Sequence, residues 1–362
     1  MKVSIVVTAY NIGQYLEKCL QSLLKTSSYI TEIICVDDGS TDNSYAIMCK
    51  YKKIDPRIIA IHKENGGISS ARNKGIQIAS GDFLIFVDGD DYIDADILNS
   101  LLDKYNWLLN SEAMTTIWCG YTREDWNGEY GVNPIFDAGC YDRGEIVEHI
   151  LPSFLGISYQ KLYKWFEGDG LQKNQEFPSV WRAVYSKRII DSNNISFNED
   201  VQTGEDLLFN WEYFAYADNI QISDTKYYHY IWRKGSLTQN TSEHFYMAKK
   251  AMEENRDIQN KRLIEVTGDL SNEYQGSLIL SKIQMAIMLS NCSLKSIITH
   301  YKMFVDYAKM RSIVNAYKKL KLKNTPIKYK LPLYMAKKRW DFLLYMGCFI
   351  LSKLKIQIYP EE

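Results

Sequence analysis

Three aspartates within four positions are the residues best suited to chemistry. Asp88, Asp90 and Asp91 flank Gly89 and directly follow an apolar run of strand length. Carboxylate oxygens are the ligands that hard divalent cations prefer, and carboxylates this close repel one another unless a cation, hydrogen bonds or solvent compensates. The pattern therefore predicts a metal site. The alternative is an acidic turn that caps a helix beginning near Asp94.

Two other segments could hold a nucleobase. Thr8, Ala9 and Tyr10 lie at the end of one β-branched run, and Asp38 follows another. A tyrosine ring packs against a flat base, and an aspartate accepts a hydrogen bond from a ring N–H, so these residues suit a uracil pocket. Ordinary strand-to-helix turns are the alternative explanation.

A glycine turn marks the third feature, the segment 65–73 with the sequence NGGISSARN. Helix N-termini and guanidinium groups both attract phosphate oxygens, which favours an anion site around Arg72. The segment is neither a P-loop nor a GxGxxG fingerprint, because the Lys-Ser/Thr pair and the spaced glycines are missing. A surface helix is the alternative.

Strands and helices alternate in the first 110 residues. The predicted strands are Val3–Thr8, Glu32–Asp37, Ile58–His62 and Phe83–Asp88. Short strands joined through helices imply the α/β class, with a mostly parallel central sheet, right-handed crossovers and helices on both faces. Ligands bind at the carboxyl ends of such strands, so we expect Tyr10, Asp38 and Asp88 at one edge of the sheet.

The residues after position 110 differ from the first 110 in composition and hydrophobic pattern. Residues 111–240 are aromatic and polar, and we interpret them as completing the same domain, 1–240. From residue 241 to 362 the pattern is mainly helical, with helices predicted at Met252–Ile264 and Leu278–Leu289. The sequence therefore predicts an α/β domain followed by a helical C-terminal region.

Composition narrows the class of protein. The 362 residues are 46% hydrophobic and carry a net charge of −1, so the chain has no overall positive charge that would attract nucleic acid. Seven cysteines form no CxxC pair, which favours buried free thiols. The chain begins with a strand pattern and lacks the apolar segment of a signal peptide, and its longest apolar stretch, Phe342–Leu351, is too short to cross a bilayer. We therefore expect a cytoplasmic location.

The chain resembles the A-type nucleotide-sugar glycosyltransferases of family 2, which include bacterial capsule, exopolysaccharide and teichoic-acid enzymes. The resemblance is close over residues 1 to about 104 and continues more thinly to about 240. It rests on the ordered blocks VSIVVTAYN, VDDGSTD, NGGISSARNKGI and FLIFVDGDD, followed by VWRAVYSKRII, GEDLLF and YIWRKGS.

This resemblance implies a GT-A fold, which is Rossmann-like, that binds a UDP-sugar and a divalent cation, Mn²⁺ or Mg²⁺. The nucleotide-sugar half would span about 1–110 and the acceptor half about 111–240. In the matching positions Asp90 would ligate the cation, while Asp88, next to Gly89, would lie near the ribose or reach the metal through water. The nucleobase would contact Thr8, Ala9, Tyr10 and Asp38, and the diphosphate would contact Arg72.

The resemblance also assigns the later blocks. Asp206 matches the general base, with Glu205 as the next candidate, and an inverting transfer needs such a carboxylate to take the acceptor proton. An acidic helix N-terminus is the alternative. The segment with His229, Trp232, Arg233 and Ser236 matches a loop over the diphosphate, where a cation such as Arg233 would neutralise the leaving group. A structural strand and turn is the alternative there.

The implied function is an inverting, metal-dependent glycosyltransferase that moves a sugar from a UDP-sugar to an acceptor glycan, lipid-linked and destined for a bacterial surface polysaccharide. Two other classes stay open. A sugar-nucleotide pyrophosphorylase also uses a parallel sheet and acidic metal ligands, but its glycine-rich phosphate loop is missing after Val7. A noncatalytic glycan-binding protein would have no use for the full acidic set.

The C-terminal region carries an unusual charge. Residues 301–362 hold 14 Lys/Arg and 4 Asp/Glu, a net charge of +10, which leaves −11 on residues 1–300. Lysines at 318–330 precede the apolar stretch Phe342–Leu351, and such a pair suits the surface of an anionic bilayer. We therefore expect peripheral attachment to the inner face of the membrane. A helical bundle with solvated lysines is the alternative, and the oligomeric state stays open.

Overall fold

The computed structural model describes the chain except for residues 112, 167–175, 234–241, 323–324, 326 and 355–362. The chain divides into two compact units. Unit 1 comprises Met1–Phe154 and Glu176–Ser236, and unit 2 comprises Leu155–Gln175 and Leu237–Glu362. Residues 155–175, which we expected in the α/β domain, therefore belong to unit 2.

Unit 1 is built on an eight-stranded sheet with the strand order β3-β2-β1-β4-β10-β6-β11-β9. The strands are β1 (Val3–Ala9), β2 (Ile30–Asp37), β3 (Ile58–His62), β4 (Phe83–Asp88), β6 (Thr115–Cys119), β9 (Gly139–Asp142), β10 (Ala183–Ser186) and β11 (Asn219–Ser223). The first four strands in this order are parallel, as predicted. Because β10 runs antiparallel to β4 and β6, the other half of the sheet is mixed. The predicted α/β class is confirmed.

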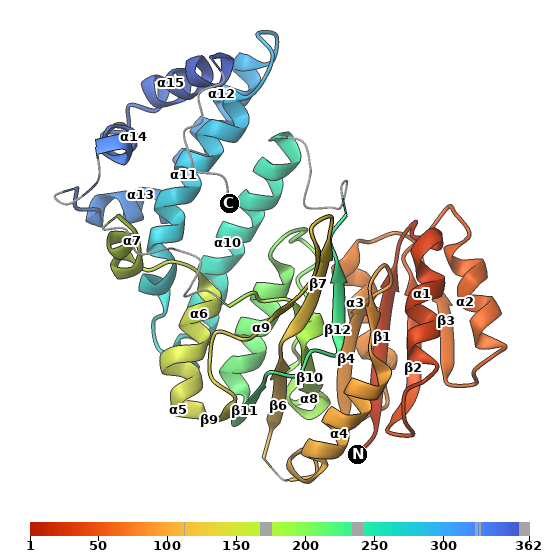
Figure 1. The fold of residues 1–362 in the computed structure, drawn as a ribbon. Helices are drawn as coiled ribbons and strands as arrows, with labels where there is room; N and C mark the ends of the chain where they lie inside the picture. Colours follow the sequence, from red (N-terminus) through yellow and green to blue (C-terminus); the bar gives the residue numbers. More distant parts are fainter. Residues whose placement is uncertain (112, 167–175, 234–241, 323–324, 326, 355–362) are drawn as a thin grey trace. The chain divides into compact units, whose positions relative to one another are not determined.

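Helices cover both faces of the parallel half (Figure 1). On one face α1 (Gly13–Leu23), α2 (Ser44–Lys52) and α4 (Ala95–Leu109) share a core with the alternate residues Val3, Ile5 and Val7 of β1. On the other face lies α3 (Ile68–Ile78). A Cβ on Gly75 would lie 2.2 Å from Val6 Cγ1, so only glycine lets α3 approach β1 this closely.

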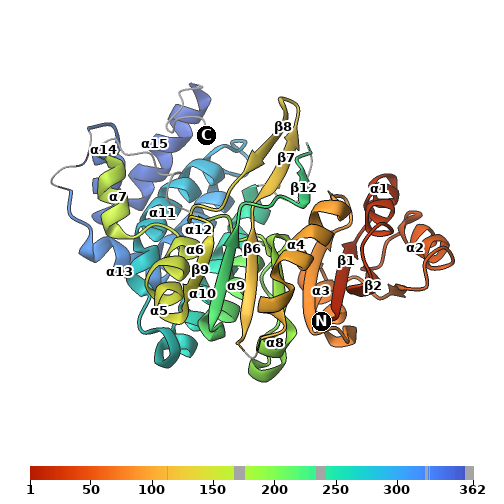
Figure 2. The same cartoon turned by 60° about the horizontal axis from the view of Figure 1, so that its bottom comes forward.

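A second sheet has the order β5-β12-β7-β8. Its strands are β5 (Tyr92–Ile93), β7 (Tyr121–Asp125), β8 (Gly128–Val132) and β12 (Tyr228–Ile231), and Figure 2 shows β7, β8 and β12 side by side. The loop Asp88–Asp91 leaves β4 of the large sheet and enters β5 of the small one. The acidic loop therefore joins the two sheets.

Shorter helices complete unit 1. They are α5 (Arg143–Glu145), a π-helical turn (Ile146–Ile150), α6 (Leu151–Leu155), a 3₁₀ turn (Val180–Arg182), α8 (Lys187–Asn193) and α9 (Glu205–Tyr216). Helix α9 starts after Gly204, whose φ of 91° lies in the left-handed region that favours glycine. Glu205 and Asp206 therefore occupy the first turn of a helix whose following residues, Leu207–Ala215, are all buried.

Unit 2 is helical, as predicted. It contains α7 (Tyr159–Phe166), α10 (Ser242–Thr267), a 3₁₀ turn (Ser271–Tyr274), α11 (Gln275–Ser290), α12 (Ile297–Ala308), α13 (Arg311–Lys319), α14 (Ile327–Lys337) and α15 (Asp341–Lys353). The central helix α11 packs against α10, α12, α13 and α15. Among the described residues no helix is both long and apolar enough to cross a bilayer. The apolar stretch in α15 buries Leu344, Tyr345, Cys348 and Phe349 within the unit.

Candidate functional site

The acidic loop is held tightly against the end of β1. Gly89 N donates a hydrogen bond to Thr8 O at 2.9 Å. A Cβ on Gly89 would lie 2.8 Å from Thr8 O and from Ile12 Cδ1, so any larger residue would push the loop away. Gly89 therefore acts through the backbone, by letting the aspartates on either side of it sit next to Thr8.

The two predicted metal ligands face arginines. Asp88 Oδ1 lies 3.0 Å from Arg72 Nη2, and Asp90 Oδ2 lies 2.6 Å from Arg233 Nη1. The two carboxylate side chains keep 24% and 38% of their surface exposed. Burial raises the pKa of Asp90, the charge of Asp88 raises it further, and Arg233 opposes both. Oxygen ligands of this kind, exposed at one loop, fit a hard divalent cation.

Asp91 has a different environment. Its side chain is buried, and its carboxylate accepts hydrogen bonds from the Tyr228 hydroxyl and from Ile231 N, both at 2.8 Å. Asp88 N donates to the same Tyr228 hydroxyl at 3.2 Å. Both Asp91 oxygens therefore bind strand β12, and the residue anchors the loop instead of facing a ligand.

The N-terminus of α4 is capped by a residue outside the Asp88–Asp91 loop. Asp94 is the N-cap of α4, and its side chain accepts a hydrogen bond from Ile97 N at 3.0 Å. The alternative explanation of the acidic run, a helix cap, thus applies to Asp94 and not to Asp88 or Asp90.

Arg72 lies at the centre of the acidic groups. Its guanidinium, 3% exposed, contacts Asp88, Asp206 Oδ1 at 2.6 Å and Glu205 Oε1 at 3.3 Å. Burial lowers the pKa of Arg72, but the three carboxylates outweigh it and the net shift is upward. Arg72 therefore stays charged and joins α3, the end of β4 and the start of α9.

Both candidate bases are partly buried. Asp206 Oδ2 accepts a hydrogen bond from Val180 N at 3.2 Å, in addition to the Arg72 contact. Burial raises the pKa of Asp206, with Arg72 opposing the shift. Burial and the neighbouring charge of Asp206 raise the pKa of Glu205 to about 8. The carboxylates of Asp206 and Glu205 therefore bind a proton more tightly than exposed carboxylates do.

The predicted nucleobase residues lie together at the ends of β1 and β2. Thr8 and Ala9 are buried, whereas Tyr10 is 50% exposed. Asp38 N donates to Ala9 O at 2.9 Å, which brings the two strand ends into contact. Tyr10 is therefore the residue of this group with surface free for a flat ring.

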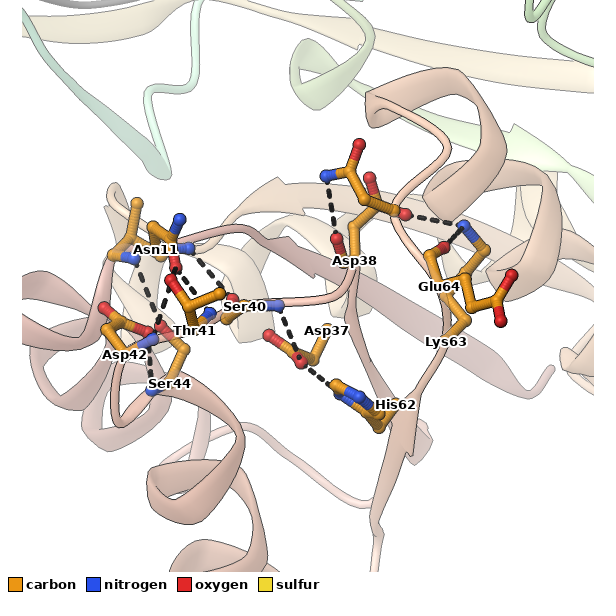
Figure 3. Close-up of polar contacts among 12 residues, drawn as sticks. Asn11, Asp37, Asp38, Ser40, Thr41, Asp42, Ser44, His62, Lys63 and Glu64 are labelled. Atoms are coloured by element: carbon orange, nitrogen blue, oxygen red, sulfur yellow. Dashed lines mark hydrogen bonds and ion pairs between the residues drawn. The ribbon is translucent and has the colours of Figure 1, made fainter.

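Asp38 holds the glycine turn in place. Its carboxylate accepts from Lys63 Nζ at 2.6 Å (Figure 3). It also accepts from Gly67 N at 2.7 Å and from Gly66 N at 3.1 Å. We expected this carboxylate to accept from a base, and in the structure these three donors already bind it. Lys63 was not among the predicted residues, and the sequence signal for it was only its position before the Asn-Gly-Gly turn.

Hydrogen bonds tie the loops after β1 and β2 to each other (Figure 3). Asn11, in the left-handed region with φ of 52°, donates its N–H to Ser40 Oγ at 2.9 Å and accepts from Thr41 N at 2.8 Å. Asp42 accepts from Gly13 N and Ser44 N, both at 2.9 Å. This network fixes the two loops that flank the exposed Tyr10 ring.

The segment 229–236, predicted to form a loop over the diphosphate, divides into a part that contacts the acidic loop and a part that packs on the small sheet. Arg233 reaches the acidic loop, as described above, and its guanidinium also lies 3.9 Å from the centre of the Tyr15 ring. His229 lies on β12, where it stacks on Tyr92 and contacts Glu124 Oε1 at 3.0 Å. Trp232 packs against Trp126 at 4.5 Å between ring centres. Ser236 lies outside the described residues.

A second set of metal-type ligands occurs on the small sheet. One ligand atom each from Glu124, Glu129 and His229 lies within 4.8 Å of the others. The His229–Glu124 ion pair and the hydrogen bond from the Tyr92 hydroxyl to Glu124 already explain this arrangement. These residues therefore form a polar cluster of the small sheet.

Comparison with known proteins agrees with this geometry. The family model "Glycosyl transferase family 2" matches residues 4–151. The uncharacterized glycosyltransferase EpsJ of Bacillus subtilis is 32% identical, over 66% of this chain and 63% of its own length. Poly(ribitol-phosphate) beta-glucosyltransferase of Bacillus spizizenii is 31% identical, over 68% of this chain and 36% of its own length. This chain thus spans less than two thirds of either relative.

A solved structure has the same fold. The crystal structure of S. aureus TarS 1-349 in complex with UDP-GlcNAc aligns with a TM-score of 0.59 at 19% identity, over 98% of this chain and 92% of that one. At this identity the likeness concerns the fold alone. The family model covers residues 4–151, which include the acidic loop at the end of β4, so this part of the chain is a glycosyl transferase family 2 domain.

Proposed function

We propose that this protein is an inverting glycosyltransferase that uses a divalent cation, Mn²⁺ or Mg²⁺, to move a sugar from a UDP-sugar to an acceptor glycan. The cluster around Arg72 carries the proposal, because it joins Asp88 at the end of β4 to Asp206 at the start of α9. A donor site and an acceptor-activating carboxylate must lie close together, since both act on one reacting carbon. A noncatalytic glycan-binding protein would have no use for this cluster.

The donor would lie along the carboxyl ends of β1, β2 and β4. Tyr10 would pack on the base, with Thr8, Ala9 and Asp38 shaping the pocket around it. Asp88 and Asp90 would hold the cation, which when bound supplies positive charge to the leaving diphosphate. Arg233, already at Asp90, and Arg72 would add positive charge to the same group.

Asp206 would take the proton of the acceptor hydroxyl. As that oxygen forms its bond to the anomeric carbon, the bond to the diphosphate breaks and UDP leaves with the electron pair. Attack from the face opposite the leaving group inverts the configuration. The raised pKa of Asp206 suits this role, because a base with higher proton affinity removes a hydroxyl proton more readily. Glu205, at 3.3 Å from the same arginine, is the second candidate.

We also propose the wider setting. The catalytic domain would span residues 1–240 without the segment 155–175, with a nucleotide-sugar half at about 1–110 and an acceptor half at about 111–240, and residues 241–362 would form a basic helical region. The acceptor is a lipid-linked glycan of a surface polysaccharide, and the protein works in the cytoplasm as a peripheral protein on the inner face of the membrane. Two relatives are named as glycosyltransferases of poly(ribitol-phosphate), and these names support a polymeric acceptor.

Release of UDP from UDP-GlcNAc, with Mn²⁺ and with an acceptor glycan present, tests the proposal. We expect Asp206→Asn to bind UDP normally and to turn over about 10²-fold more slowly, the scale for losing a positioned base. Glu205→Gln is the matched control. If Glu205→Gln loses turnover while Asp206→Asn keeps it, the two roles must be exchanged, and normal turnover by both variants would contradict the mechanism.

A further inference from the structure

One face of the small sheet carries a row of three residues with a tyrosine at each end. Tyr230 of β12 is the register partner of Arg123 of β7, and Arg123 is the register partner of Tyr130 of β8. Side chains in directly paired positions lie on the same face of a sheet. Adjacent strands are about 4.8 Å apart, so the row extends about 10 Å across three strands.

The inner end of the row lies near the acidic loop. The Tyr230 ring stacks on Trp181 at 5.6 Å between centres, and Trp181 follows Val180, whose N–H holds Asp206. Burial raises the pKa of the Tyr230 hydroxyl, and the charge of Asp91 raises it further. A molecule lying along the row would thus have one end near the acidic loop, whose Asp91 accepts a hydrogen bond from Ile231 N, the residue after Tyr230.

The middle of the row is a guanidinium with unused donors. Arg123 Nε lies 3.4 Å from Asp125 Oδ2 and is buried without a hydrogen-bond partner among the described residues. Its side chain is one third exposed. The planar N–H fork of arginine matches the oxygens of a phosphate, so this donor pair fits a phosphodiester.

The outer end is exposed and aromatic. Tyr130 is 43% exposed, its ring centre lies 5.9 Å from the Arg123 guanidinium, and its hydroxyl donates to Asp125 Oδ2 at 3.2 Å. The carboxylate of Asp125 partly neutralises the charge of Arg123. However, the Asp125 side chain is only 4% exposed, and its oxygens already contact Arg123 Nε, the Tyr130 hydroxyl and Asn127 N. The surface therefore presents two tyrosine rings with a cation between them.

We propose that the row Tyr230–Arg123–Tyr130 is the acceptor subsite and that it binds a polyol- or sugar-phosphate chain. The phosphate would lie on Arg123, and the carbon faces of the flanking polyol or sugar units would lie on the two tyrosine rings. This inference rests on the proposed glycosyltransferase function and adds the chemical class of its acceptor. A neutral glycan acceptor is the competing outcome.

Titration of the full-length protein with a ribitol-phosphate trimer and with neutral maltotriose tests the subsite. The wild type is expected to bind the phosphate oligomer at least 10-fold more tightly than maltotriose. Arg123→Ala should remove that preference, and Arg123→Lys should keep part of it, because lysine retains the charge but lacks the fork. Tyr130→Ala, an exposed change that leaves Arg123 in place, should weaken binding of the phosphate oligomer several-fold.

Glu129→Ala is the matched control, since Glu129 precedes Tyr130 but points to the opposite face, toward His229. It should bind the oligomer like the wild type. UDP with Mn²⁺ should bind equally to all four variants, and a loss of UDP affinity in Arg123→Ala would place Arg123 in the donor site and overturn the inference. Equal binding of the two oligomers by the wild type would also overturn it. Absence of UDP binding by the wild type would instead contradict the proposed function.

Discussion

Arg72 Nη1 lies 2.6 Å from Asp206 Oδ1, although 134 residues separate the two in the sequence. The same guanidinium contacts Asp88, so one buried cation bridges the acidic loop and the first turn of α9. Without Arg72 these carboxylates would lie close together with no positive partner, and their mutual repulsion would oppose the fold. This contact is the physical link between the donor side and the acceptor side of the site.

Replacement of Asp90 by asparagine should abolish metal-dependent binding of UDP without unfolding the protein, because an amide lacks the negative charge that a hard cation requires. Calorimetry of UDP with Mn²⁺ measures the effect. Asp96→Asn, an exposed aspartate in the first turn of α4, is the matched control and should bind like the wild type. Unchanged affinity in Asp90→Asn would show that Asp90 is not a ligand.

Removal of the Tyr228 hydroxyl should misalign the acidic loop, because that group bonds both Asp91 Oδ2 and Asp88 N. We expect Tyr228→Phe to weaken UDP–Mn²⁺ binding about 10-fold and to destabilise the protein by about 1–3 kcal/mol, the cost of unpaired buried polar groups. The matched control is Tyr227→Phe, which removes a neighbouring buried hydroxyl that bonds Trp181 O. Equal UDP affinity in both variants would exclude a positioning role for Tyr228.

The raised pKa of Glu205 should make the stability of the fold depend on pH. Its pKa in the folded state is about 8, above the ordinary value of 4.5, so between these values the folded protein holds a proton that the unfolded chain has lost. The free energy of unfolding should therefore fall as pH rises from about 5 to 8. Urea unfolding across this range should show a smaller fall in Glu205→Gln. Identical slopes in the two proteins would contradict the shift.

The basic C-terminal region should bind anionic vesicles if it attaches the protein to a membrane. Each lysine near such a surface contributes about 1 kcal/mol, so changing Lys318, Lys319, Lys321 and Lys330 to glutamine should abolish co-sedimentation of the full chain. The same number of exposed lysines changed in unit 1, at Lys2, Lys52, Lys53 and Lys104, provides the control. Equal pelleting of both variants, or none by the wild type, would favour the solvated helical bundle.

The sequence by itself determined the parallel half of the large sheet and the positions of its motifs. β-branched runs such as 3–8 and 83–88 form strands because their side chains are buried on both faces, and glycines such as Gly75 and Gly89 are needed where backbones meet. Strand ends in such a sheet share one edge, so Tyr10, Asp38 and Asp88 could be placed at that edge from sequence pattern alone.

Tertiary structure alone decided which partners these residues have. Nothing in the pattern shows that Arg72 is buried among three carboxylates, that Asp91 bonds β12, or that Asp38 holds the glycine turn. The small sheet also escaped prediction, since β5 is two residues long and pairs with β12, which comes 135 residues later in the chain. Contacts between distant segments depend on packing in three dimensions, because local periodicity carries no information about which strand or helix a side chain will meet.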